Sequence, residues 1–200
     1  MKIGLFGGSF DPPHWGHVLP VEAARERLGL ARVWFLPTAR PPHKPERRFA
    51  PSLARLTMVE LATLHRPGLF VSPFEVRSEE PSYTIDSVEH FGREYPEAEL
   101  VLLLGLDSFV GFHTWRRFRD IARLARLAVL ARPGWGERLA EADPEVRSWL
   151  ETGRAELLAG PAVAASSSAL RAALAQGELP ADGMVPDLVL DYIAKYSLYR

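Results

Sequence analysis

Six short runs of apolar residues are spread along the chain, and most end at glycine, proline or a polar residue. Apolar runs bounded by turn-forming residues are typical of β-strands. The run at 100–104 is aliphatic throughout, which indicates a strand buried on both faces, as in a parallel sheet. The predicted strands span 3–6, 33–36, 69–76, 100–104, 127–131 and 155–158.

Between these runs, apolar positions recur with the spacing of a helix. Gly29 closes the first such segment and the Pro67–Gly68 pair closes the second. Ser52 and Thr84 are the expected N-caps of two helices. The predicted helices span 16–28, 52–64, 84–94, 117–124, 136–150, 169–175 and 185–199.

The alternation of strands and helices predicts an α/β fold with a Rossmann-like parallel sheet and helices on both faces. We expect one domain over residues 1–200, with a small C-terminal helical part at about 166–200. Ligands of such sheets bind outside the carboxyl ends of the strands, at the point where the strand order reverses. The residues that directly follow the strands are therefore the candidates for function.

Composition narrows the class of protein. The chain has 200 residues, 24 Lys and Arg against 25 Asp and Glu, and no cysteine. This balance is that of a globular protein, and the near-zero net charge argues against a broad nucleic-acid or membrane surface. The absence of cysteine excludes disulfides, thiolate nucleophiles and Cys-ligated zinc. No apolar run is long enough for a membrane span, and the start of the chain reads as a strand, so we expect a soluble, cytoplasmic protein.

The most informative segment, residues 7–17, reads Gly-Gly-Ser-Phe-Asp-Pro-Pro-His-Trp-Gly-His and joins the first strand to the first helix. Glycines let a ligand approach the backbone, and the N–H groups at a helix start favour phosphate. The spacing of His14 and His17 places both imidazoles on one side, and Gly16 between them removes a side chain that would crowd a ligand. A glycine-rich turn alone is weak evidence, and two histidines alone are too few for a closed zinc site. Their combination after the first strand is more specific.

This segment resembles the signature of nucleotidyltransferases that carry a His-x-Gly-His motif. Class I aminoacyl-tRNA synthetases have a related motif, but they also need a Lys-Met-Ser-Lys-Ser loop, which this sequence lacks. The resemblance implies a nucleotidyltransferase fold, with His14 and His17 holding the triphosphate of ATP. It also implies that the ATP site is lined by Gly7, Gly8, Ser9 and Phe10.

A second string, Ser-Ser-Ser-Ala-Leu-Arg at 166–171, opens a late helix. Taken alone, it is read as a serine N-cap followed by a surface arginine. It resembles the Ile-Ser-Ser-Thr-x-Ile-Arg motif of the same family, which implies ATP contacts for Ser166, Ser167, Ser168 and Arg171, with a catalytic role for Arg171. Two motifs of one family, about 150 residues apart and in the expected order, make coincidence a poor explanation.

Three strings in the middle of the chain resemble segments of the bacterial nicotinate-mononucleotide adenylyltransferases. They are Pro-Pro-His-Lys at 41–44, Ser-Tyr-Thr-Ile-Asp at 82–86, and Gly-Leu-Asp-Ser at 105–108 followed by Trp115. The resemblance implies that Gly105 and Asp107 contact the nucleotide. It implies that the mononucleotide is bound by Thr38, Lys44, Tyr83, Thr84, Trp115, Arg116 and Arg132. From the residues alone, Trp115 fits a packing role equally well, and Lys44 could be a solvated lysine in a rigid connector.

The reaction implied by this resemblance is adenylyl transfer from ATP to nicotinate mononucleotide, giving deamido-NAD and pyrophosphate, a step of NAD biosynthesis. The substrate 5′-phosphate is already anionic, so no general base is needed, and His14, His17, Lys44 and Arg171 would supply positive charge and hydrogen bonds. Mg²⁺ is expected to arrive with ATP, without a dedicated protein metal site.

Four questions stay open from the sequence. The acceptor could instead be nicotinamide mononucleotide or phosphopantetheine. The scaffold could serve as a non-catalytic nucleotide sensor, although intact histidines and Arg171 argue against that. The sequence does not reveal whether the protein forms a homo-oligomer. The role of residues 137–162, where the resemblance is weakest, is also open.

Overall fold

The predicted parallel sheet forms the centre of the molecule. The computed structural model describes residues 1–40, 49–78, 80–131, 136–161, 163–178, 180 and 183–200. Its six-stranded sheet has the order β3-β2-β1-β4-β5-β6, and the strand pairs are parallel. The strands are β1 (Lys2–Gly8), β2 (Arg32–Pro37), β3 (Leu69–Val71), β4 (Glu99–Gly105), β5 (Arg126–Ala131) and β6 (Ala155–Ala159).

The central strand β1 is the point at which the strand order reverses. Phe6 of β1 lies opposite Phe35 of β2 on one side and Leu103 of β4 on the other. The chain then leaves β1 at Gly7 and Gly8, which are still paired with β2. The predicted binding turn therefore lies where ligands of parallel sheets bind.

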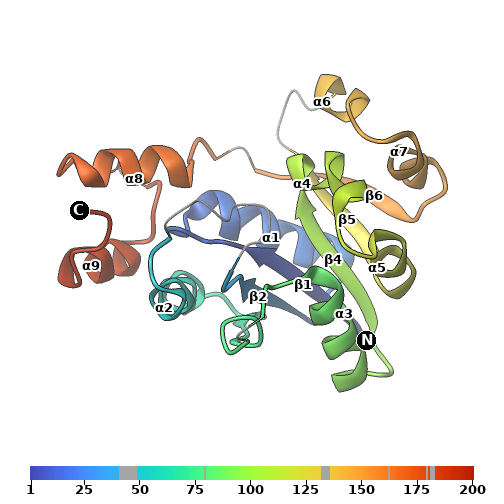
Figure 1. Cartoon of the computed structure of the whole chain (residues 1–200), viewed down its shortest axis with the longest axis horizontal. Coiled ribbons are helices and arrows are strands. Elements are labelled where there is room, and N and C mark those ends of the chain that lie inside the picture. The colour runs from blue at the N-terminus through green and yellow to red at the C-terminus, as the bar shows by residue number, and fades with distance from the viewer. Residues whose placement is uncertain (41–48, 79, 132–135, 162, 179, 181–182) are drawn as a thin grey trace.

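Helices cover both faces of the sheet, as predicted (Figure 1). One core forms between the sheet and α1 (Trp15–Leu28), α2 (Ser52–Thr63), α8 (Ser167–Ala175) and α9 (Asp187–Lys195). The other forms with α3 (Thr84–Glu94), α4 (Leu106–Val110), the 3₁₀ helix η1 (Phe112–Thr114), α5 (Phe118–Leu124) and α7 (Pro144–Glu151). Along β4, Val101 and Leu103 enter the first core, whereas Leu100, Leu102 and Leu104 enter the second. This alternation explains why the run at 100–104 is apolar at every position.

Several predicted boundaries were wrong for local reasons. The strand expected at 69–76 ends at Val71, and a turn follows in which the Arg77 N–H donates to the Pro73 carbonyl. The helix expected at 136–150 is two helices, α6 (Gly136–Ala140) and α7, because the Asp143 side chain caps a new helix that has Pro144 in its first turn. Helix α4 was not predicted. The N-caps of α2 and α3 are Pro51 and Tyr83, one residue before the serine and threonine expected there.

The C-terminal helices α8 and α9 lie together at one side of the sheet, next to the ends of α1 and α2 (Figure 1). The end of the chain returns from α9 toward the first strand-to-helix turn, where Tyr199 makes a contact described below. Within the described ranges, no helix has the length and apolar character needed to span a membrane.

Candidate active site

The first strand-to-helix turn is anchored in the core by an aromatic side chain. Phe10 is buried, although its backbone φ of 46° lies in the left-handed region that few side chains adopt. Its ring lies 5.7 Å from that of Phe6, 5.8 Å from that of Phe35 and 5.2 Å from that of His17. Core packing therefore fixes the path of the turn and places His17 beside it.

The two histidines lie on one side of the start of α1, as their spacing predicted. His14 is the N-cap, and its N–H donates to Nδ1 of His17 over 3.3 Å. The ring centroids are 3.8 Å apart. A ring nitrogen accepts a hydrogen bond only when it is unprotonated, so this contact favours a neutral His17 with its proton on Nε2.

Gly16 lines a cavity beside His17 and also leaves room for a neighbouring side chain. A Cβ atom at this position would lie 2.9 Å from His14 Nδ1 and 3.0 Å from Cε1 of the same ring. Such distances are shorter than ordinary van der Waals contact. Gly16 therefore makes room for the imidazole of His14.

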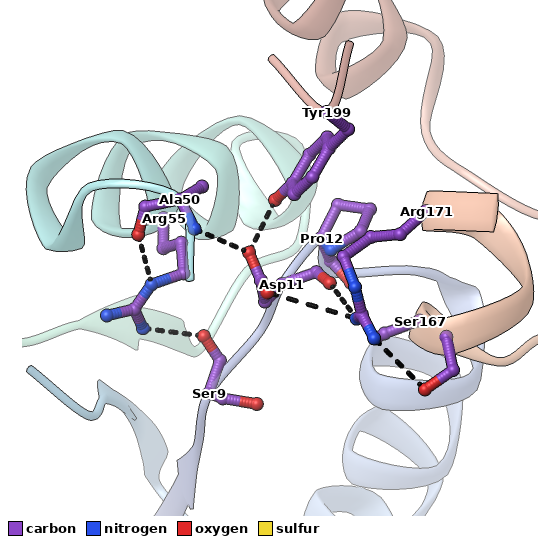
Figure 2. Close-up of polar contacts among 9 residues, drawn as sticks. Ser9, Asp11, Pro12, Ala50, Arg55, Ser167, Arg171 and Tyr199 are labelled. Atoms are coloured by element: carbon purple, nitrogen blue, oxygen red, sulfur yellow. Dashed lines mark hydrogen bonds and ion pairs between the residues drawn. The ribbon is translucent and has the colours of Figure 1, made fainter. Parts of the chain in front are cut away.

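The serine–arginine string at 166–171 packs directly against this turn, although about 155 residues separate them. The Ser167 hydroxyl donates to the Pro12 carbonyl over 2.9 Å, and Arg171 Nη1 donates to the Asp11 carbonyl over 2.7 Å. Arg171 Nη2 also donates to Ser168 Oγ. Figure 2 shows this side of the turn. The fold thus joins the two motifs into one site.

Asp11 connects the turn to three other segments (Figure 2). Its side chain is fully buried, and Oδ1 accepts from the Ala50 N–H over 3.1 Å and from the Tyr199 hydroxyl over 2.8 Å. Oδ2 forms an ion pair with Arg171 Nη1 at 3.8 Å. Burial, together with the charge of Asp11, raises the pKa of Tyr199 above its usual range, so this hydroxyl remains a donor.

Arg55 of α2 supports the same turn from the other side. The residue is 1% exposed, and its guanidinium donates to three carbonyls, those of Ser9 (2.7 Å), Ala50 (3.0 Å) and Ala39 (3.2 Å). Burial lowers the pKa of Arg55, whereas the nearby Asp11 and Tyr199 raise it. The arginine is therefore occupied by backbone oxygens and fixes the geometry of the turn.

Two cavities open beside the turn, and Gly105 at the end of β4 lines both. The larger, of about 210 Å³, is bordered by Gly8 and Ser9 and by residues from β2, α3 and the segment after η1. The smaller, of about 130 Å³, is bordered by His17, Gly16 and residues near the ends of β5 and β6. The turn thus borders the larger cavity through Gly8 and Ser9, and the start of α1 borders the smaller one through Gly16 and His17.

Comparison with known proteins identifies the family. Residues 5–173 match the model of the cytidylyltransferase-like family. A protein of Dechloromonas aromatica named probable nicotinate-nucleotide adenylyltransferase is 41% identical over 216 residues, which covers 99% of this chain and 97% of that protein. A protein of the same name from Thermomicrobium roseum is 40% identical over 199 residues, covering 100% and 92%. The chain belongs to the nicotinate-nucleotide adenylyltransferase family.

A solved member of this enzyme class shares the fold. The structure of Plasmodium falciparum nicotinic acid mononucleotide adenylyltransferase complexed with NaAD superposes with a TM-score of 0.78, covering 99% of this chain and 97% of that one. The sequences are 18% identical. At such low sequence identity the similarity is one of fold, and it confirms the predicted nucleotidyltransferase fold.

Most of the residues predicted to bind the mononucleotide border the larger cavity. Thr38, Tyr83, Thr84, Trp115 and Arg116 all line it, and the Arg116 guanidinium lies 4.7 Å from the centre of the Tyr83 ring. Their backbones come from the end of β2, the start of α3 and the segment after η1. The fold therefore gathers residues spread over 79 positions of sequence around one space.

The structure does not place Asp107, Lys44 or Arg132 in either cavity. The Asp107 side chain is 84% exposed, borders neither cavity, and forms an ion pair with Arg138 of α6 at 2.7 Å. Lys44 and Arg132 lie outside the described residues. Their proposed roles stay predictions.

Sequence reasoning missed the buried and half-buried polar groups that hold the site together. They are Asp11, Arg55, Glu75, Ser87 and Tyr199. One signal was present: Arg55 falls on the apolar face of α2, among Ala54, Met58 and Val59, where a charge needs partners. No local pattern distinguished Glu75 or Tyr199 from ordinary surface residues.

Proposed function

We propose that this protein transfers the adenylyl group of ATP to nicotinate mononucleotide, producing deamido-NAD and pyrophosphate. The observation that carries this proposal is identity of about 40% over the whole chain with proteins named for this activity. The joining of the two motif segments at the carboxyl end of β1 supports it, because both are needed to surround a polyphosphate.

The triphosphate of ATP would lie against the start of α1. His17 Nε2 can donate a hydrogen bond while Nδ1 is occupied, and the partial positive charge of the helix start adds to this attraction. Arg171 and the serines of α8 face the same turn and would provide the remaining donors. The smaller cavity beside His17 and Gly16 would receive the adenine side of the nucleotide.

The mononucleotide would occupy the larger cavity. Trp115 and Tyr83 offer aromatic surface for the pyridine ring, and the backbone N–H groups at the start of α3 lie next to Thr84. Arg116 is the positive group along this cavity among the described lining residues, and it would attract the carboxylate of the nicotinate.

The chemical step would be in-line displacement at the α-phosphorus. An oxygen of the substrate 5′-phosphate forms a bond to that phosphorus, the bond to the bridging oxygen of the β-phosphate breaks, and pyrophosphate leaves with the electron pair. The nucleophile needs no base, so catalysis rests on positioning and on stabilising the leaving group. His14, His17 and Arg171 are the residues we assign to that task, with Lys44 as a further phosphate contact.

Mg²⁺ would accompany ATP in this mechanism. Among the described residues, no three His, Asp or Glu side chains gather closely enough to hold a metal ion. The cation would be held mainly by the phosphate oxygens, whose charge it would neutralise during transfer.

A pyrophosphate-release assay tests the proposal. Purified protein is incubated with ATP and Mg²⁺ together with nicotinate mononucleotide, nicotinamide mononucleotide or phosphopantetheine, and the dinucleotide product is identified by mass. We expect the highest kcat/KM with nicotinate mononucleotide. Preference for another acceptor would overturn the substrate assignment, and ATP binding without pyrophosphate release with any acceptor would favour a nucleotide sensor.

A further inference from the structure

A buried carboxyl group borders the larger cavity, and the mechanism above does not use it. Glu75 lies in the turn after β3, and only 6% of its surface is exposed. It borders the same space as Tyr83, Thr84 and Trp115. Among the described lining residues, Glu75 is the single carboxylic acid and Arg116 the single base.

The immediate partners of Glu75 are hydroxyl groups. Ser87 Oγ of α3 donates to Glu75 Oε1 over 2.8 Å, in a contact that is buried from solvent. The hydroxyls of Thr38 after β2 and Ser82 before α3 also interact with this carboxyl. Three segments that surround the cavity therefore meet at one side chain.

No cation forms an ion pair with Glu75 in the described part of the chain. Asp86 of α3 acts electrostatically on Glu75, and two further titratable residues, Tyr83 and Arg116, line the same cavity. Asp86 carries a like charge, and Arg116 lies over the Tyr83 ring. Burial, reinforced by Asp86, outweighs the hydroxyl donors and raises the pKa of Glu75.

We propose that Glu75 is a specificity-determining residue that couples binding of the pyridine carboxylate to protonation of this buried side chain. This inference rests on the proposed function, because it concerns the acid substrate assigned to the same cavity. A protonated Glu75 is neutral and can donate one hydrogen bond. Once ionised, it would place a second negative charge beside the space proposed to receive the nicotinate carboxylate, and the burial of Glu75 would limit solvent screening of that charge.

The coupling predicts a difference between two substrates that differ at one group. Nicotinate and nicotinamide mononucleotides share the ribose and the 5′-phosphate, so ionisation of that phosphate affects both alike. The amide has no charge to be repelled by Glu75. As pH rises through the pKa of Glu75, KM for the acid should therefore increase about tenfold relative to KM for the amide, while the ratio of their kcat values changes little.

The experiment measures kcat and KM for both mononucleotides from about pH 4.5, near the ordinary pKa of a glutamate, up to about pH 9.5, in the wild-type protein and in Glu75→Gln. Gln keeps the shape and the hydrogen-bonding capacity of protonated Glu75 but cannot ionise. In this variant, KM for the acid should no longer rise with pH relative to KM for the amide. Glu80→Gln, an exposed acid on the same segment, is the matched control and should keep the wild-type pH profile.

A second measurement needs no variant. Titration calorimetry of the wild-type protein, in buffers with different ionisation enthalpies, counts the protons taken up when each mononucleotide binds. On the alkaline side of the profile we expect proton uptake with the acid and less with the amide.

Two results would overturn the inference. The first is a ratio of KM for the acid to KM for the amide that rises with pH in Glu75→Gln as it does in the wild type. The second is equal proton uptake with both substrates. If the wild-type protein instead releases no pyrophosphate with nicotinate mononucleotide at any pH, the proposed function itself fails. The two failures are therefore distinguishable.

Discussion

The contact between Tyr199 and Asp11 allows a quantitative test of how the C-terminal segment supports the binding turn. Tyr199→Phe removes one hydroxyl and leaves the ring in place. The hydroxyl donates over 2.8 Å to a fully buried carboxylate. Hydrogen bonds to charged groups contribute about 1.5–3 kcal/mol. Asp11 keeps its contacts with Ala50 and Arg171, so we expect the free energy of unfolding to fall by about that amount.

Thermal and guanidinium chloride unfolding at neutral pH measure this loss. For a chain of this length, it corresponds to a decrease of about 3–12 °C in Tm. Tyr196→Phe is the matched control, because Tyr196 belongs to the same segment and is 55% exposed. We expect the control to change stability by less than about 0.5 kcal/mol.

The pH dependence of the free energy of unfolding supplies a second, independent check. Burial and Asp11 raise the pKa of Tyr199 in the folded protein, so the folded state holds the phenol proton more tightly than the unfolded state does. The stabilisation is fully present below about pH 10, the unfolded pKa, and is lost as pH rises beyond it. The difference between wild type and Tyr199→Phe should therefore shrink above about pH 10. A variant as stable as wild type at neutral pH would refute the role given to this hydrogen bond.

Three further substitutions test the site. His17→Ala should lower kcat by about 100-fold or more while changing KM for the mononucleotide much less, as steady-state kinetics will show; near-wild-type kcat would remove this histidine from the mechanism. Trp115→Ala should raise KM for the pyridine substrate about tenfold and leave KM for ATP nearly unchanged, and an unchanged pyridine KM would assign Trp115 to packing. Gly16→Ala should lower kcat at least tenfold without global unfolding, because the new Cβ would lie 2.9 Å from His14. Kinetics combined with a thermal melt will check this, and a fully active variant would show that the ring can move without loss.

Local sequence patterns were sufficient for most of the fold. Apolar periodicity and glycine placement predict the strand cores, the bounds of α3 and the position of the turn after β1. Both signals depend only on residues that are close together in the chain. Predictions failed where a single residue changed the local geometry. A turn closed on the Pro73 carbonyl replaces the second half of the strand expected at 69–76, and the Asp143 side chain caps α7; neither effect is visible in average hydrophobicity.

By itself, the sequence predicted a parallel α/β sheet with a turn rich in glycine and histidine after its first strand, and motif resemblance predicted the serine–arginine string as its partner. Only the tertiary structure decided which groups hold these parts in place. Asp11 meets Tyr199 across 188 residues, and Glu75 meets hydroxyls from three segments. The physical reason is that periodicity reports which face of an element is buried, whereas the partners of a buried charge are set by chain segments that come together only when the sheet and its helices are assembled.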